Sequence, residues 1–137
     1  MVTVKKSLGV EVERPKATSI LYLVGGDDFS ALHRLEFNEF YHFSVGASVE
    51  IFLIHSSGKS ETVFLGPKVD KGEKLQLMIP AGTLQGVRSL GDWSLMGTAM
   101  CPGFDFDDFQ MPTREELIMK YPDLKADITR FTRPMTF

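Results

Sequence analysis

The feature that most constrains this sequence is an alternating segment in its middle, followed by a short turn and a second alternating segment. In the segment 48–55, successive side chains divide between the two faces of an extended strand, with Val49, Ile51 and Leu53 on one and Glu50, Phe52 and Ile54 on the other. The polar residues 56–59 separate this segment from the run 61–65. Two such segments joined by a short polar turn are typical of an antiparallel hairpin. The centre of the chain is therefore predicted to be β-structure.

Shorter β-prone runs occur along most of the remaining chain. They are rich in β-branched, aromatic and other apolar residues, and they lie at 18–24, 74–79, 84–90 and 93–100. Turn-forming residues, glycine and aspartate among them, separate several of these runs. Short strands divided by closely spaced turns are typical of an antiparallel sandwich or barrel. We therefore expect an all-β fold.

One segment near the end of the chain predicts helix. Thr113 and Glu116 have the spacing of a capping box, and Pro122 ends the helix that follows them. Residues 123–129 predict a further short turn. The expected organisation is a single domain over residues 1–137, a small β-barrel with a helical appendage at 113–129.

The composition argues against several classes of partner. The chain has 137 residues and a formal net charge of −3, whereas binding to a nucleic-acid backbone needs a concentrated positive face. No apolar run approaches the length that crosses a bilayer, so no membrane partner is expected. Cys101 is the only cysteine and no apolar signal segment precedes the first strand, which together predict a reducing, cytoplasmic location.

Two segments resemble the two sequence motifs of the cupin superfamily. Motif one, at 33–46, has His33, Glu39 and a closing glycine at the spacing of the cupin pattern. Motif two, at 72–89, contains a Pro-Ala-Gly turn followed by a strand. Leu35 and Gln85 stand at two positions where the superfamily pattern has histidines. The spacing of the motifs is therefore kept, while half of the metal-ligand chemistry is changed.

The sequence around the motifs is similar to the group called cupin family 5, most distinctively in the Pro-Gly-Phe-Asp-Phe run at 102–106. This resemblance implies a double-stranded β-helix, the cupin jelly roll, and a homodimer. The chain departs from the family at its N-terminus, which lacks a His-Pro-Glu-Gly-Gly segment, and at Tyr41 and Leu84, where the family has tryptophan. The fold is expected to be shared, and the ligand is not implied by the resemblance.

In a cupin, His33 and Leu35 would point into the barrel because alternate residues of a strand share a face, and Glu39 and Gln85 would complete the ring. His33 and Glu39 are the candidate catalytic residues, since a carboxylate can orient an imidazole and keep its pKa near neutral. A hydrogen-bonded pair with a purely structural role is the alternative. His33, Glu39 and Gln85 are also the candidate metal ligands, but a set lacking two imidazoles predicts at most a weakly bound divalent metal and no certain cofactor.

Four polar residues are candidates for contacting a small-molecule ligand. Tyr41 shares the inward face with Glu39 and offers a flat ring with a hydroxyl, although plain core packing is its alternative role. His42 falls on the opposite face, from which only a β-bulge would bring it to the pocket. Gln76 suits either the cavity or the solvent-facing side of its strand, and Gln85 stands in the motif-two position.

These residues support three functional hypotheses. The first is a small-molecule-binding cupin that acts as an enzyme, using His33 and Glu39 for acid–base chemistry on a sugar-like or other small polar metabolite, as an epimerase or isomerase does. The second is a non-catalytic binding or regulatory cupin, which the loss of two metal-type ligands favours. The third is a metal-dependent oxygenase or isomerase, which needs an ion that this sequence supports poorly.

Overall fold

The fold of this chain is given by a computed structural model that describes residues 1–134. Its strands are β1 (Val2–Lys5), β2 (Glu11–Arg14), β3 (Thr18–Gly25), β4 (Phe29–His33), β5 (Glu39–Gly46), β6 (Val49–Ile54), β7 (Ser60–Leu65), β8 (Gln76–Ile79), β9 (Leu84–Ser89) and β10 (Trp93–Met100). Its helical elements are η1 (Val69–Lys71), η2 (Phe106–Asp108), α1 (Arg114–Lys120), η3 (Pro122–Leu124) and α2 (Lys125–Arg130). All six runs that the sequence predicts as strands are strands in the structure.

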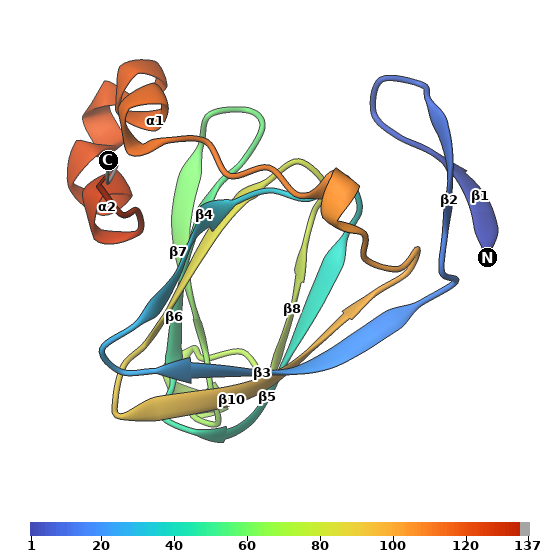
Figure 1. Cartoon of the computed structure of the whole chain (residues 1–137). Helices are drawn as coiled ribbons and strands as arrows, with labels where there is room; N and C mark the ends of the chain where they lie inside the picture. Colours follow the sequence, from blue (N-terminus) through green and yellow to red (C-terminus); the bar gives the residue numbers. More distant parts are fainter. Residues whose placement is uncertain (135–137) are drawn as a thin grey trace.

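Two four-stranded antiparallel sheets face each other and form the body of the protein (Figure 1). The first sheet has the strand order β3-β10-β5-β8, and the second has the order β4-β9-β6-β7. The chain changes sheets at most of its turns, because strands that follow one another in sequence mostly belong to opposite sheets. This winding is that of a double-stranded β-helix, so the expected jelly roll is confirmed.

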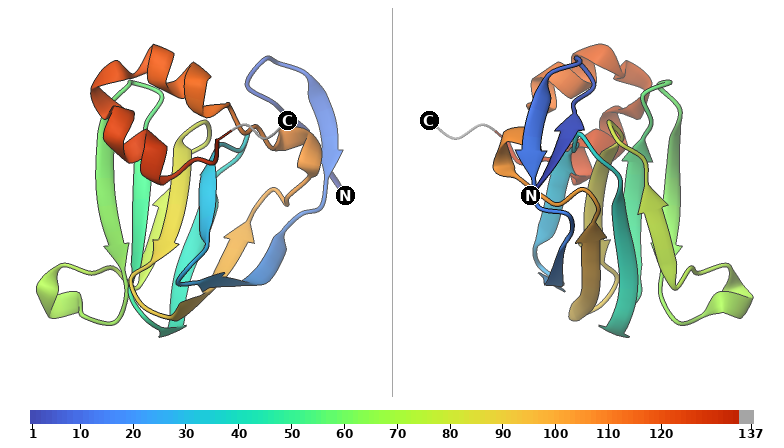
Figure 2. Two further views of the ribbon diagram at one scale, coloured as in Figure 1. Left: turned by 60° about the vertical axis from the view of Figure 1, so that its left-hand side comes forward. Right: turned by 90° about the vertical axis from the view of Figure 1, so that its right-hand side faces the viewer.

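The outer face of the second sheet is covered by the C-terminal helices (Figure 2). The Thr113 side chain accepts a hydrogen bond from the Glu116 amide and the Glu116 side chain accepts one from the Thr113 amide, so the predicted capping box begins α1. The helices and the outward side chains of the sheet share one apolar cluster, Leu32, Phe52, Ile54, Leu84, Leu117, Ile128 and Phe131. Every residue of β6 is consequently buried, which explains why both of its faces are largely apolar.

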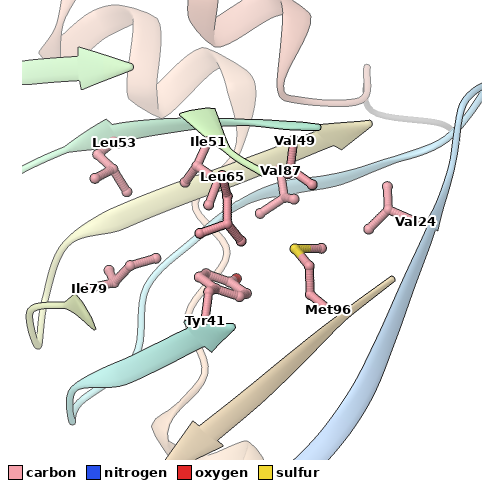
Figure 3. Close-up of a cluster of buried hydrophobic side chains, with 9 residues drawn as sticks. All are labelled: Val24, Tyr41, Val49, Ile51, Leu53, Leu65, Ile79, Val87 and Met96. Carbon is pink, nitrogen blue, oxygen red and sulfur yellow. The ribbon is translucent and has the colours of Figure 1, made fainter. Parts of the chain in front are cut away.

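A second apolar cluster fills one part of the space between the sheets (Figure 3). Its buried members come from both sheets and are Val24, Tyr41, Val49, Ile51, Leu53, Leu65, Ile79, Val87 and Met96. The alternation of the central hairpin places Val49, Ile51 and Leu53 in this cluster, as the sequence predicts.

A separate two-stranded hairpin, β1–β2, stands beside the body and contacts η2 (Figure 1). Arg14 of the hairpin donates two hydrogen bonds of 2.7 and 2.8 Å to the buried carboxylate of Asp108. This pair ties the N-terminal hairpin to the segment after β10. Among residues 1–134, none of the helices has the length and apolar character that a membrane span requires.

Candidate functional site

A pocket of about 520 Å³ lies between the two sheets, beside their edge strands β3 and β4. It is lined by side chains from four strands, from the segment 104–111 and from the C-terminal segment. These residues are Thr18, Ser19, Ile20, Tyr22, Phe29, Ser30, Ala31, His33, Leu35, Glu39, Tyr41, Thr98, Met100, Phe104, Phe109, Met111 and Arg133. Three of the sequence-predicted site residues, His33, Glu39 and Tyr41, therefore line one pocket.

His33 ends β4 and presents a neutral imidazole to the pocket. Its Nδ1 atom lies 2.7 Å from the carbonyl oxygen of Ala31, and because a carbonyl only accepts, Nδ1 carries the proton. Nε2 is then the nitrogen with the lone pair. Burial lowers the pKa of His33, although the hydrogen bond to Ala31 opposes that shift. The ring also stacks on Phe109 at a centroid distance of 5.1 Å, which fixes its orientation.

Glu39 begins β5 and points inward from the first sheet. Burial raises the pKa of its carboxyl, and the side chains of Gln85 and Thr98 oppose this rise. Within residues 1–134, its Oε1 atom is buried and has no hydrogen-bond partner. A buried carboxylate oxygen without a partner is costly, so this atom is either protonated or paired with a donor from a water or another bound molecule.

Tyr41 and Gln85 form a buried hydrogen bond beneath the pocket. The Tyr41 hydroxyl donates to Gln85 Oε1 at 2.6 Å, and both side chains are almost completely buried. Burial also raises the pKa of Tyr41 well above its usual value, so the hydroxyl keeps its proton. Gln85 is not among the lining residues. Its role is to hold Tyr41, which itself both packs in the apolar cluster and lines the pocket.

His33 and Glu39 line the same pocket without bonding to each other. Within residues 1–134, no hydrogen bond joins the two side chains, so the pair expected from the sequence does not form in this structure. The physical reason is that the Nδ1–H group of His33 donates its hydrogen bond to the Ala31 carbonyl, and Nε2 then has no proton to donate to the carboxylate of Glu39. Each group therefore faces the pocket as a separate polar site.

His42 and Gln76 are placed outside the pocket. Both are exposed, and they are paired positions on the outer face of the first sheet, where β5 lies beside β8. β5 keeps its regular alternation from Glu39 to His42, because the irregularity in its pairing with β10 comes later in the strand. The structure thus does not bring His42 or Gln76 to the other candidate residues.

The donor set does not fit a tightly held divalent metal of the cupin type. Leu35 occupies the second histidine position and lines the pocket with hydrocarbon. The Oε1 atom of Gln85 is taken by Tyr41. Among the described residues, no group of three or more His, Cys, Asp or Glu side chains is arranged to hold a metal ion. One imidazole and one carboxylate remain, fewer ligands than a tight first-row metal site has.

The aromatic segment after β10 does not keep the alternation of an extended strand. Phe104 lines the pocket, whereas Phe106 is 80% exposed. The alternation fails because η2 replaces an extended strand at 106–108 and turns Asp108 inward to pair with Arg14. Phe109 lies against His33 instead.

Sequence reasoning missed several further lining residues. Tyr22 and Phe29 come from strand positions with no distinguishing neighbour in the sequence. Arg133 follows the last helix, far along the chain from either motif, and reaches the pocket through contacts with Asp28 and Phe29. The one sequence feature that pointed to this wall of the pocket was the group of phenylalanines at 104–109, because a solvent-exposed loop does not require so many aromatic side chains.

Solved structures of two proteins are similar to this chain over nearly its whole length. A protein from Shewanella oneidensis is 32% identical, has a TM-score of 0.87, and is matched over 96% of this chain and 84% of that one. A hypothetical protein from Leishmania major is 25% identical with a TM-score of 0.88, over 97% of this chain and 84% of that one. Neither description states an activity.

More distant solved structures share the fold alone. RmlC from Streptococcus suis, in complex with dTDP-D-xylose, is 11% identical with a TM-score of 0.55, over 67% of this chain and 47% of that one. A dTDP sugar isomerase from Desulfovibrio desulfuricans is 15% identical with a TM-score of 0.57, over 81% of this chain and 79% of that one. No curated protein matches the chain. The sequence matches the family described as Cupin superfamily (DUF985) over residues 2–112, and the protein is therefore a member of this cupin family.

Proposed function

We propose that this cupin binds a small organic molecule in the pocket between its sheets. The observation that carries the proposal is the buried Oε1 atom of Glu39, which has no hydrogen-bond partner among residues 1–134 and belongs to a side chain that lines the same hollow as His33. Buried polar atoms in folded proteins nearly always have a hydrogen-bond partner, and a ligand with a donor group would supply one here. The pocket volume of about 520 Å³ lies in the range typical of small-molecule sites.

The pocket is also rigid enough to select a ligand. The stacking of Phe109 fixes the ring of His33, and Gln85 fixes the hydroxyl of Tyr41. Side chains that are already held in place lose little entropy when a ligand binds, so more of the contact energy appears as affinity. These contacts support specific binding rather than an incidental void.

Acid–base catalysis is the second candidate function, favoured by the opposite pKa shifts of the two polar groups. Burial lowers the pKa of His33, which leaves Nε2 free to take a proton, and raises the pKa of Glu39, which helps it to hold one. A base and an acid on one pocket are suited to moving a proton between two positions of a bound molecule, as an isomerase or epimerase does. The sugar-isomerase neighbour supports this by analogy of fold.

Binding is tested with a panel of nucleotide sugars, nucleobases and small organic acids, read as a shift in the thermal unfolding midpoint. We expect at least one class to stabilise the protein, and His33→Ala to weaken that stabilisation because it removes Nε2 from the pocket. His55→Ala is the matched control, since His55 pairs with Glu61 outside the pocket. Equal stabilisation of the wild type and His33→Ala by every ligand of the panel would contradict the proposal.

Catalysis is separated from binding by hydrogen exchange. The ligand found in the panel is incubated with the protein in D₂O, and deuterium at its carbon atoms is followed by mass spectrometry. An acid–base enzyme incorporates deuterium at the carbon that it deprotonates, and His33→Ala loses this incorporation even at saturating ligand. A ligand that binds without any deuterium incorporation contradicts proton transfer at the carbon atoms of that ligand and leaves binding as the function supported.

We also propose that the outer face of the first sheet pairs with a second copy of the chain. Leu21, Leu23 and Val45 on this face are 77%, 65% and 50% exposed. None of the outward side chains of β3, β10, β5 and β8 is Asp, Glu, Lys or Arg, so two copies related by a two-fold axis meet without like charges. No helix among residues 1–134 covers this face, whereas helices cover the outer face of the other sheet.

Light scattering coupled to size-exclusion chromatography tests this pairing. We expect a mass of twice 15.4 kDa for the wild type and 15.4 kDa for Leu21→Glu, which places a charge on this face in the middle of the edge strand β3. Leu8→Glu is the control, because Leu8 is 90% exposed at the tip of the separate hairpin. A wild-type mass of 15.4 kDa would contradict the pairing.

A further inference from the structure

We infer that the pocket takes a small organic acid with a ring-sized apolar body, whose hydroxyl end lies at Glu39 and whose anionic end lies at Arg133. The inference rests on the proposed binding function and names the chemical class of its ligand. It differs from the sugar-like ligand that the sequence suggests, and three features of the pocket carry it.

The walls of the pocket are mostly hydrocarbon. Five phenylalanine and tyrosine rings and the side chains of Ile20 and Leu35 line it, with methionines at Met100 and Met111. A sugar presents hydroxyls in most directions, and each hydroxyl buried against such walls loses a hydrogen bond to water without replacement. An apolar ring gains from the same burial, so these walls favour a ring over a sugar.

The outer end of the pocket has a guanidinium that is ion-paired with Asp28 and still has donors to offer. The Nη2 atom of Arg133 donates to the carbonyl oxygen of Phe29 at 2.8 Å and to the carboxylate of Asp28, and the guanidinium lies over the Phe29 ring at 4.1 Å. Within residues 1–134, these bonds use Nη2 alone, which leaves the Nε and Nη1 donors. A guanidinium held in one orientation is well suited to a carboxylate.

The inner end of the pocket accepts hydrogen bonds. The Oε1 atom of Glu39, which no described residue bonds, belongs to a side chain at this end, and the Nε2 atom of His33 carries a lone pair. A hydroxyl donates to either atom, whereas a carboxylate at this end would face the carboxyl of Glu39. The guanidinium at one end and the hydrogen-bond acceptors at the other therefore orient the ligand, with its acid toward Arg133 and its hydroxyl toward Glu39 and His33.

The test compares three probes by isothermal titration calorimetry: 4-hydroxyphenylacetate, its methyl ester, and phenylacetate. The first has both end groups, the second lacks the charge, and the third lacks the hydroxyl. We expect the complete probe to bind about tenfold more tightly than its ester, because the ester loses the charge-assisted bonds to Arg133. It should also bind about tenfold more tightly than phenylacetate, because phenylacetate leaves Glu39 without a donor.

Two variants with the same change in charge complete the test. Arg133→Gln should bind the acid and its ester with equal affinity, whereas Lys71→Gln, on η1 outside the pocket, should keep the wild-type preference. The thermal midpoint of each unliganded variant shows that it is folded. A wild type that binds the ester as tightly as the acid, or that binds no probe at about 10 mM, overturns the inference.

The outcome also separates this inference from the proposed function. If a nucleotide sugar binds with the expected dependence on His33 while none of the three probes does, the binding function stands and the assigned ligand class is wrong. If neither the panel nor the probes bind in a manner that depends on His33, both fall.

Discussion

The interior between the two sheets has a filled half and a hollow half, and the strands β3, β5 and β10 contribute side chains to both. In the filled half, Leu53 and Ile79 belong to a cluster of buried aliphatic side chains (Figure 3). In the hollow half, β5 turns Glu39 inward and β10 turns Thr98 inward, and both line the pocket. Tyr41 belongs to both halves. The comparison shows that one part of β5 and of β10 stabilises the barrel, while another part of the same strands carries polar groups that stability alone does not require.

The largest effect on stability is expected in the filled half. Leu53→Ala removes a side chain that is only 1% exposed and leaves a cavity, which costs about 2–5 kcal/mol in the free energy of unfolding. Leu35→Ala, on the wall of the pocket, should cost less because Leu35 already borders empty space. Urea denaturation measures both. Equal losses would show that the two halves are packed alike.

A smaller effect is expected at the boundary between the halves. Tyr41→Phe keeps the ring in the cluster but removes the hydroxyl that donates to Gln85, leaving a buried acceptor unpaired. We expect a loss of about 1–3 kcal/mol in the free energy of unfolding. The double variant Tyr41→Phe with Gln85→Leu should recover part of that loss, since it removes both polar partners. A double variant less stable than Tyr41→Phe would contradict this role for Gln85.

The pH dependence of stability should distinguish the two polar groups of the hollow half. The unfolded pKa of His33 is 6.5 and its folded pKa is lower, so below pH 6.5 the unfolded chain binds the extra proton and stability falls as the pH falls. The unfolded pKa of Glu39 is 4.5 and its folded pKa is higher, so above pH 4.5 the folded protein retains the proton and stability falls as the pH rises.

Two variants separate these opposite slopes. His33→Asn should remove the loss of stability that begins as the pH drops below 6.5, and Glu39→Gln should remove the loss that begins as the pH rises above 4.5. Thermal unfolding across this range, compared with the wild type, measures each contribution. Unchanged profiles in both variants would mean that these groups do not titrate with shifted pKa values.

The smallest effect is expected on the rim of the pocket. Phe106→Ser should change the free energy of unfolding by less than about 0.5 kcal/mol, because Phe106 is 80% exposed. Phe109→Ser removes the ring stacked on His33 and should weaken ligand binding as well as stability. A loss of binding in Phe106→Ser equal to that in Phe109→Ser would contradict the placement of these two rings.

The fold was predictable from the sequence because alternation and turns report directly on strands. The two faces of 48–55 correspond to the interior cluster and to the cluster under the helices, and the capping box at Thr113 begins a helix. The candidate site was predictable only in part. Motif spacing located His33 and Glu39 and strand alternation located Tyr41, whereas Phe109 and Arg133 reach the pocket through tertiary contacts that no local pattern records.

The failures also have local physical causes. Gln76 is a polar residue on a strand, and its sequence neighbours are compatible with either face of the sheet. The expected His33–Glu39 hydrogen bond depended on which acceptor bonds to the Nδ1–H group of His33. That acceptor is the backbone carbonyl of Ala31, and no sequence pattern indicates this contact.

The central claim is that the hollow half is a binding site rather than a packing defect, and a crystal structure of the protein with 4-hydroxyphenylacetate tests it most directly. The account predicts electron density for the ligand between β3 and β4, with its hydroxyl within hydrogen-bond distance of Glu39 Oε1 and its carboxylate beside Arg133. Density for the ligand elsewhere on the surface, or an interior in which side chains have closed the hollow, would contradict it.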